Sequence, residues 1–210
     1  DVRQFGAKGD GTTDDTEAIR HAAEDGDGVL DFSTGNYLIS DTIEVSLTKR
    51  GPCAITGDEG TSTVLMRGKG PAFRLVGAHG GTGDPDSVTP RVWKSERMPT
   101  VRNIAVDGAH PEADGFELIE TMQAVFEGVM VRRARHGIHL LKRNRNFLMS
   151  RCHLYHNTGA GLYLDGVNLH QINVANSHIS YNRMGGIRIE RSEVRNLQIT
   201  GNDIEYNNAK

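Results

Sequence analysis

The chain has 210 residues, which is long enough to build one sizeable hydrophobic core. Its 24 basic and 27 acidic residues give a formal net charge of −3, and this balance argues against nucleic-acid binding, which usually brings a basic excess. No apolar run approaches the roughly 18 residues that a membrane-spanning helix requires, so we expect no membrane span.

The cysteine content argues against a structural zinc site. Cys53 and Cys152 are the only cysteines, and they form no C-x-x-C pair. We expect both thiols in apolar positions without a disulfide bond. The chain opens at Asp1 on what resembles the start of a domain, so we expect any signal peptide to have preceded it.

The N-terminal segment predicts a short helix followed by two strands. Asp14 and Asp15 suit the positive N-terminal end of a helix, so this pair of carboxylates is interpreted as capping and not as catalytic. Apolar residues at helical spacing follow at Ala18, Ile19, Ala22 and Ala23. The glycine-rich run at 25–28 ends the helix, and strands are expected at 29–32 and 37–39.

Residues 77–100 fit no repeat and predict an inserted loop, punctuated by glycines and prolines. Long insertions between regular elements often form the walls of functional sites. Trp93, the single tryptophan, lies among basic residues and would suit stacking on a sugar ring, so we assign it to substrate binding. The alternative, that Trp93 packs the loop down onto the rest of the protein, stays open.

A phrase of the form glycine–apolar–x–apolar recurs later in the chain, at Gly115, Gly137, Gly161 and Gly186. Alternate side chains of a strand point to opposite faces, so the apolar residues are expected inside and the residue x outside. The outward residues then form one solvent-facing column on neighbouring strands: Glu117, His139, Tyr163 and Arg188.

This column carries the residues that we assign as catalytic. In β-elimination on a polysaccharide, a base removes the proton next to a carboxylate, a cation neutralises that carboxylate, and an acid assists the departing oxygen. His139 or Tyr163 would move the proton, and Arg188 would hold the carboxylate in a bidentate manner. The alternative is an exposed sheet face with ordinary mixed residues.

Basic residues gather in one short stretch, at Arg132, Arg133, Arg135, Lys142, Arg143 and Arg145. They indicate either a solvated turn or a site for an acidic polymer. On the second interpretation, Arg135, Lys142 and Arg143 are assigned to substrate binding.

The last third of the chain repeats every 25 residues, with the same phrase around Asn157, Asn182 and Asn207. A period of about 20–50 residues is the signature of a solenoid, whose repeats bury their apolar faces against one another. Because sharp bends leave backbone groups unpaired, we expect these asparagines to form an internal ladder between coils.

A second outward column is expected at His153, His178 and Asp203, which share the 25-residue spacing. Two imidazoles and a carboxylate are chemically suited to a metal ion. Outward histidines on a solenoid are more often plain surface residues, so we assign no metal ligands.

The N-terminal phrase from Phe5 to Ile19, with Gly35-Asn-Tyr-Leu-Ile after it, resembles the opening of the pectate lyase superfamily, and residues 55–65 resemble an early coil of that family. The resemblance implies an all-β solenoid: a right-handed parallel β-helix with a short N-terminal capping α-helix. It implies a single β-helix domain over residues 1–210, with the cap and first coil in 1–45. A helix laid across the first coil would cover its apolar end and its unpaired strand edges.

The resemblance also implies a carbohydrate-active protein that acts on an acidic extracellular polysaccharide, most simply as a polysaccharide lyase. No cofactor is assigned, although calcium would be compatible with that chemistry. The chain lacks the Asn-Thr-Asp and Gly-His-Gly phrases of polygalacturonases, the acid cluster of calcium-dependent pectate lyases and the Tyr-Gly-x-Asp-Pro-His phrase of alginate epimerases.

Other functions stay open on the same residues. The chain could be a non-catalytic glycan-binding or structural β-helix of the tailspike or adhesin kind, or a glycoside hydrolase. It stops in mid-repeat, at Lys210, so we expect a further domain or subunit to cover the C-terminal end.

Overall fold

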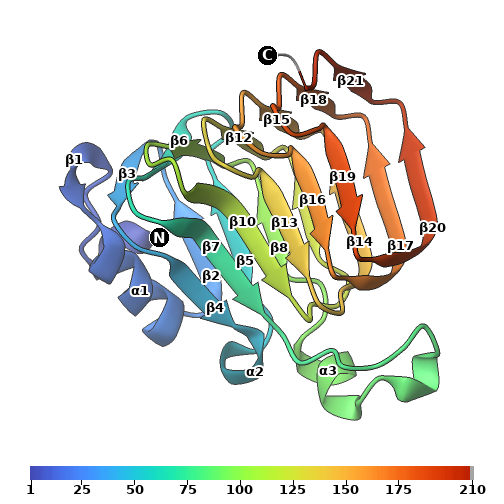
Figure 1. Ribbon diagram of the computed structural model, residues 1–210. Coiled ribbons are helices and arrows are strands. Elements are labelled where there is room, and N and C mark those ends of the chain that lie inside the picture. The colour runs from blue at the N-terminus through green and yellow to red at the C-terminus, as the bar shows by residue number, and fades with distance from the viewer. Residues whose placement is uncertain (209–210) are drawn as a thin grey trace.

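A computed structural model describes residues 1–208 of the chain. The chain winds into successive coils, and each coil contributes one short strand to each of three faces (Figure 1). Within the described residues, the strands pair into three all-parallel sheets of eight, seven and six strands. The 25-residue repeat predicted a solenoid, and the family resemblance implied the parallel β-helix that this architecture is.

The strands of the three sheets interleave along the chain, in the order sheet C, sheet B, sheet A in each later coil. Sheet A comprises β1 (Asp10–Asp14), β3 (Gly35–Ile39), β6 (Ser62–Met66), β9 (Ala105–Gly108), β12 (Met130–Arg132), β15 (His153–Tyr155), β18 (His178–Ser180) and β21 (Asp203–Glu205). Sheet B comprises β2 (Val29–Phe32), β5 (Ala54–Gly57), β8 (Thr100–Arg102), β11 (Val125–Glu127), β14 (Arg145–Ser150), β17 (Asn168–Ala175) and β20 (Glu193–Thr200). Sheet C comprises β4 (Ile43–Ser46), β7 (Gly70–Val76), β10 (Ala113–Ile119), β13 (Ile138–Leu141), β16 (Leu162–Asp165) and β19 (Ile187–Glu190).

Short helices occupy the N-terminal end and the insertion: η1 (Val2–Phe5), α1 (Thr16–Asp25), α2 (Leu47–Arg50), η2 (Pro85–Ser87) and α3 (Pro90–Ser95). Helix α1 lies across the first coil, as expected of a cap, and buries Ile19 and Ala22 against it. Among the described helices, none combines the length and the apolarity that crossing a membrane demands.

The two carboxylates before α1 are structural, but they do not both cap the helix. Asp14 accepts a hydrogen bond from the Thr16 N–H, at 3.0 Å. Asp15 occupies the N-cap position, yet its carboxylate turns back and accepts from the Lys8 and Gly9 N–H groups, at 2.7 and 3.0 Å. Asp15 therefore ties the preceding loop to the helix instead of satisfying the helix's own N–H groups.

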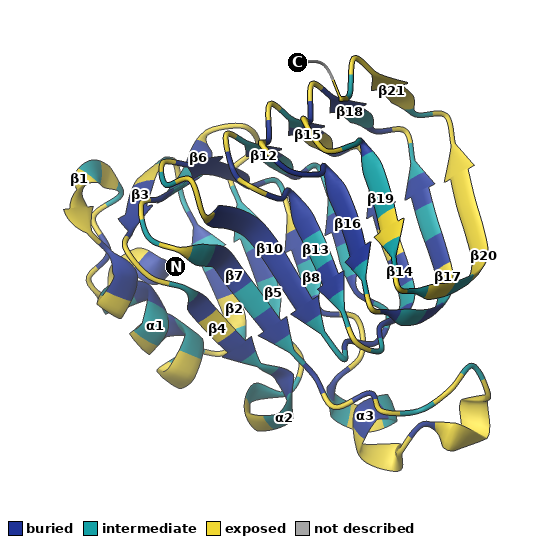
Figure 2. Cartoon of the chain, viewed as in Figure 1, coloured by how far each residue is buried: buried dark blue, intermediate teal, exposed yellow. Residues whose placement is uncertain are grey.

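The buried apolar residues of all three sheets form one continuous core. Figure 2 shows buried residues, in dark blue, along the strands of successive coils. Fully buried aromatic rings run through the first part of this core, with consecutive centroids between 5.1 and 5.9 Å apart: Tyr37, Phe32, Phe73, Phe116, Phe126 and Phe147. Such contacts add edge-to-face and stacking energy to the burial of large apolar surfaces.

The predicted asparagine ladder is confirmed. The side-chain oxygen of Asn182 accepts from the backbone N–H and the Nδ2 of Asn157, at 3.3 and 2.9 Å. In the same way, the side-chain oxygen of Asn207 accepts from the backbone N–H and the Nδ2 of Asn182, both at 3.0 Å. Each amide therefore satisfies backbone and side-chain groups at the bend between sheets A and C.

Both thiols are free, as expected. Cys152 is fully buried and Cys53 is half-buried. Burial raises the pKa of Cys53 to about 12 and that of Cys152 to about 11, because a thiolate is costly away from water.

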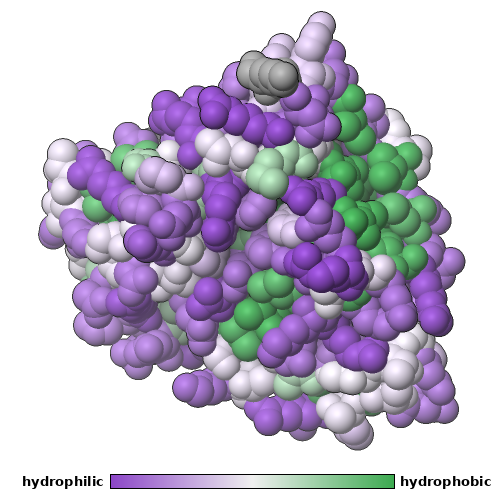
Figure 3. Space-filling view, in the orientation of Figure 1, coloured by the Kyte–Doolittle hydropathy of each residue, from purple (hydrophilic) through white to green (hydrophobic). Residues whose placement is uncertain are grey.

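Apolar surface is exposed over β19 and β20, at the right edge of the space-filling view (Figure 3). Ile189 and Ile199, which lie there, are paired in register with the buried Leu164 and Val174 of the preceding coil. Their side chains are inward residues of the last described coil.

Candidate functional site

Sheet C aligns the predicted catalytic column. Glu117 pairs with His139, His139 with Tyr163, and Tyr163 with Arg188, each on the neighbouring parallel strand. The column extends toward the N-terminus through Arg74 and Glu44. The glycine-based alignment therefore gave the correct register.

Contrary to the expectation of a solvent-facing column, these side chains are largely covered. Glu117 and Tyr163 are only 9% and 8% exposed, and the side chain of His139 is also largely covered. Neighbouring strands lie about 4.8 Å apart, so the outward side chains of successive coils pack against one another. The ring of His136 packs against the rings of His139 and Tyr163 and covers them further. The site is a filled cluster of rings and ion pairs on the outer side of sheet C.

His139 lies at the centre of this cluster. Its ring stacks on Tyr163 with centroids 4.7 Å apart, and among residues 1–208 neither ring nitrogen has a hydrogen-bond partner. Its Nε2 lies 3.7 Å from Oδ2 of Asp165. Burial lowers the pKa of His139 below its ordinary value, and the nearby carboxylates of Asp114, Glu117 and Asp165 only partly oppose this shift. The imidazole is therefore neutral near pH 7 and has a nitrogen able to accept a proton.

The arginines of the column are engaged in ion pairs. Arg74 donates to Glu117, with Nε and Oε1 2.5 Å apart. Arg188 donates from Nε to Oε1 of Glu190, at 2.8 Å, and its guanidinium lies over the Tyr163 ring. The Tyr163 hydroxyl donates to Oε2 of Glu190, at 2.6 Å. Burial and this carboxylate raise the pKa of Tyr163, so the phenol stays protonated.

Sequence reasoning missed His136, which completes the cluster. Its ring lies 4.9 Å from that of Tyr163 and 5.4 Å from that of His139. Its Nδ1 accepts from the Ala160 N–H at 3.1 Å, and burial lowers its pKa to about 4. His136 directly precedes the repeat glycine Gly137 and so lies outside the repeated phrase. Its role follows only from its contacts with neighbouring coils, which the spacing of residues in the sequence does not reveal.

Asp165 and Glu190 were also missed, although a signal existed. They pair with each other across neighbouring strands and stand four residues after the repeat glycines Gly161 and Gly186. Extending the glycine-based alignment by one position beyond the apolar residue would have found them.

The residues assigned to substrate binding do not gather around His139. Arg135 comes nearest, since it binds the buried Asp114, whose Oδ1 also accepts from the His136 N–H. Lys142 is exposed at the corner after β13. Arg143 donates to the carbonyl of Gly81, at 3.1 Å, and so ties the inserted loop to the solenoid.

The inserted loop runs from the end of β7 to the start of β8 and contains η2 and α3. Figure 1 shows it beyond the C-terminal ends of the sheet C strands and not over the outer face of that sheet. Arg145 fixes it there by donating to the carbonyl of Thr82, at 2.8 Å. Trp93 packs beside the small apolar cluster of Val88, Val92 and Met122. In this structure, therefore, Trp93 anchors the loop.

The second outward column is also in register, on sheet A. His178 pairs with His153 and with Asp203 on the neighbouring strands. Its Nε2 lies 3.8 Å from Oδ2 of Asp203 and 3.9 Å from Oε1 of Glu205. One imidazole and two carboxylates within reach of one another could hold a divalent cation. Calcium takes roughly six to eight oxygen ligands, so this set alone falls short of a calcium site.

The coil, the three parallel sheets and the outward polar columns define a right-handed parallel β-helix. The chain belongs to the family described as the right-handed β-helix region, whose sequence model matches residues 92–210. A second family model, described as rhamnogalacturonase A/epimerase, pectate lyase-like, matches residues 1–85. The recognised resemblance to pectate lyase-like proteins is thereby supported at the N-terminal end.

Solved structures with a similar fold share little sequence with this chain. The catalytic domain of Agl-KA is 14% identical, with a TM-score of 0.71 over 96% of this chain and 37% of its own. ORF18 of Geobacillus virus E2 is 15% identical, with a TM-score of 0.59, over 93% of this chain and 52% of its own. PfbA, a surface adhesin of Streptococcus pneumoniae, is 13% identical, with a TM-score of 0.52, over 94% of this chain and 61% of its own.

This chain thus spans only about half the length of ORF18, and at these identities the likeness shows the fold alone. A comparison with curated protein sequences found no match.

Proposed function

We propose that this β-helix acts on an acidic extracellular polysaccharide by β-elimination, with His139 as the proton-abstracting base. The observation that carries the proposal is the state of this side chain. It is a neutral imidazole without a hydrogen-bond partner in the described residues, set between a phenol and several carboxylates. Groups with shifted pKa values and unused hydrogen-bonding capacity concentrate at functional sites.

The neighbouring residues suit the other steps of an elimination. His139 takes the proton from the carbon next to the uronate carboxylate, a carbon–carbon double bond forms, and the glycosidic C–O bond breaks. Tyr163, held protonated, gives its proton to the departing oxygen. Arg188 uses two of its five N–H groups on Glu190, so three remain for the uronate carboxylate.

The remaining assigned residues have supporting roles in this proposal. Glu117 is held by Arg74 and faces His139, and its carboxylate raises the proton affinity of that imidazole. Arg135 would bind the polymer close to the column. Trp93, Lys142 and Arg143 would contact more distant sugar units of the polysaccharide, near the inserted loop. The pectate lyase-like description of the N-terminal family match supports this class of substrate.

A non-catalytic glycan-binding function is the second candidate, and the position of the inserted loop favours it. The loop leaves the outer face of sheet C without a wall, and both Arg74 and Arg188 already have carboxylate partners. The fold likeness to PfbA, a surface adhesin, is compatible with binding at a cell surface. The fold likeness to the catalytic domain of Agl-KA is equally compatible with an enzyme.

A panel of uronate polymers, followed by ultraviolet absorbance for new unsaturated ends, tests the enzymatic proposal. We expect turnover on at least one polymer, and a loss of at least about 100-fold in His139→Ala. His153→Ala, which removes an exposed histidine from sheet A, is the matched control and should keep full activity. A folded chain without activity on every polymer would favour the glycan-binding function, and full activity of His139→Ala would remove His139 from the mechanism.

A further inference from the structure

One imidazole and two carboxylates converge on the outer face of sheet A, where β18 and β21 lie side by side. The register of the strands brings them together, because His178 is paired with Asp203, and Glu205 follows two residues later on the same face of β21. One ligand atom of each side chain lies within 4.8 Å of those of the other two. Three groups from two coils are therefore close enough to share one ion.

The distances are close to those of a zinc site. Ligand bonds of about 2.0–2.2 Å in tetrahedral geometry separate two ligand atoms by about 3.3–3.6 Å. Nε2 of His178 lies 3.8 Å from Oδ2 of Asp203 and 3.9 Å from Oε1 of Glu205. All three side chains are partly exposed, so small rotations can close the difference. At these distances no hydrogen bond joins the imidazole to either carboxylate, and the ligand atoms keep their lone pairs.

The two carboxylates also lack a permanent counter-charge. Among residues 1–208, neither Asp203 nor Glu205 forms an ion pair with a lysine or an arginine, and their ionic contacts are with His178 alone. On sheet C, by contrast, Glu117 and Glu190 are each paired with an arginine. Two close carboxylates without a cation repel each other. A divalent cation between them would remove this repulsion.

Ser180 is an independent indication of a ligand at this place. It is fully buried, and its hydroxyl has no hydrogen-bond partner in the described part of the chain. It is paired with Glu205, and together with His178 it lines a hollow of about 440 Å³. A buried hydroxyl without a partner is costly. A water molecule on a bound ion would give this hydroxyl a partner.

We propose that His178, Asp203 and Glu205 form a zinc site that links the last two coils that the structure describes. Three protein ligands and one water complete the four-coordinate arrangement that zinc prefers. Imidazole suits zinc better than magnesium or calcium, and both of these take more oxygen ligands than this set supplies. Because the ligands come from β18 and β21, the ion holds β21 onto the preceding coil. The site lies on a different sheet from His139.

Isothermal titration of the untagged chain with zinc chloride tests the proposal, with calcium chloride and magnesium chloride as comparisons. We expect one zinc ion to bind per chain, at least about tenfold more tightly than either comparison ion. The melting temperature should rise with the zinc concentration, because the ion binds only the folded chain. His178→Ala and the double variant Asp203→Asn/Glu205→Gln should each bind zinc at least about tenfold more weakly and lose this rise.

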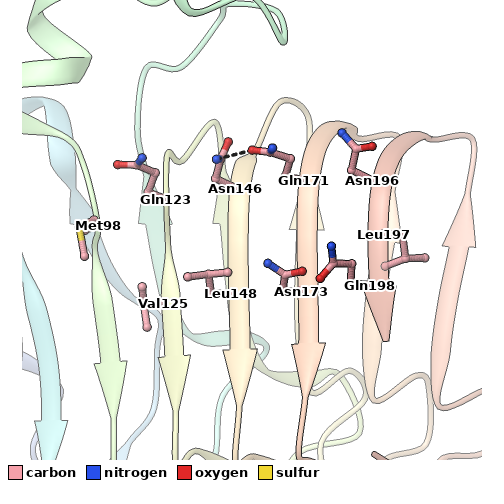
Figure 4. A pocket seen from close by; sticks show the side chains of 10 residues that line it. All are labelled: Met98, Gln123, Val125, Asn146, Leu148, Gln171, Asn173, Asn196, Leu197 and Gln198. Carbon is pink, nitrogen blue, oxygen red and sulfur yellow. Dashed lines mark hydrogen bonds between the residues drawn. The ribbon is translucent and has the colours of Figure 1, made fainter. Parts of the chain in front are cut away.

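Two control variants should bind zinc like the wild type. His153→Ala removes the imidazole that is paired with His178 on its other side. Asn173→Ala/Gln198→Ala changes an outward pair of sheet B on the same two coils. Figure 4 shows this pair in a hollow of about 630 Å³, and neither amide belongs to the proposed zinc site.

The proposal is overturned if zinc does not bind, if it binds equally well to His178→Ala or to the carboxylate variant, or if calcium binds best. Zinc binding that is lost in His153→Ala and kept in the carboxylate variant would overturn it in favour of a pair of histidines. The carboxylate variant relieves a repulsion, so its melting temperature without zinc should not fall. His139→Ala should bind zinc normally, so this test does not depend on the proposed elimination.

Discussion

The imidazole of His139 lies flat on the phenol ring of Tyr163, with 4.7 Å between the ring centroids and 10° between the planes. The two residues are paired on adjacent strands, so the stack is a direct consequence of the parallel register. Stacking covers the imidazole, and this burial is the main reason why its pKa falls. The fold thus produces a neutral, oriented histidine that has no hydrogen-bond partner among residues 1–208.

The first prediction concerns the proton affinity of His139. NMR titration of its ring should give a midpoint below the ordinary value of 6.5, because burial outweighs the nearby carboxylates. Asp165→Asn removes one of the charges that favour the protonated form, so the midpoint should fall further. Asp203→Asn, a change beside His178, should leave the His139 midpoint where it is. A His139 midpoint at or above 6.5 in the wild type would contradict the environment described for it.

The second prediction concerns stability in acid. His136 has its pKa lowered to about 4 in the folded chain, against 6.5 for an ordinary histidine, so the unfolded chain binds more protons between these values. The free energy of unfolding should therefore increase as the pH is raised from about 4 to about 6.5. The same stability is lost when the pH is lowered through this range. A protonated Nδ1 would also carry a hydrogen that repels the Ala160 N–H, from which Nδ1 now accepts a hydrogen bond.

Urea titrations at several pH values measure this slope. His136→Asn keeps an acceptor at the Nδ1 position but cannot be protonated, so its stability should depend less steeply on pH. Some slope should remain, because burial also lowers the pKa of His79 to about 4. An unchanged slope in His136→Asn would mean that His136 does not titrate in this range.

The register of the β-helix could be read from the sequence because side-chain direction in a strand has a strict period of two. Aligning Gly137 with Gly161 placed His139 beside Tyr163, and the 25-residue spacing placed Asn157 beside Asn182. Both predictions needed only local periodicity and the rule that coils stack. They hold because each coil repeats the backbone path of its neighbour.

The burial and the ion pairing of the column could not be read in the same way. Arg74 and Glu117 are 43 residues apart, with the inserted loop between them, so no repeat phrase connects them. Trp93 sits in that loop, where no periodicity predicts which surface it contacts. Side-chain contacts across insertions depend on tertiary packing, and the sequence alone left both interpretations of Trp93 open.

The third prediction concerns the asparagine ladder. Asn182→Ala should destabilise the chain by about 2 kcal/mol or more, because the backbone N–H and Nδ2 of Asn157 would lose their common acceptor in a buried bend. Chemical denaturation of the variant measures the change. Asn36→Ala, at an exposed strand position, is the control and should stay within about 0.5 kcal/mol of the wild type. Equal stability of the two variants would show that the ladder contributes little.

The fourth prediction concerns the repeat glycines, which the alignment used only as markers. A Cβ on Gly137 would lie 2.4 Å from the carbonyl oxygen of Gly161, far inside van der Waals contact. That oxygen cannot move away easily, because it accepts the Ile138 N–H at 2.9 Å and so holds two coils together. Gly137→Ala should therefore separate the coils locally and cost about 1–3 kcal/mol, as overpacking does in a filled core.

Gly80→Ala is the matched control for the Gly137 variant, since a Cβ on Gly80 meets no atom of the described part of the chain within 4 Å. It should leave the free energy of unfolding unchanged or raise it slightly, because alanine restricts the unfolded chain. Thermal and urea unfolding of the two variants, side by side, give the comparison. If Gly137→Ala were as stable as Gly80→Ala, the coils could spread without loss. The repeat glycines would then reflect the bend of the backbone and not the close approach of neighbouring coils.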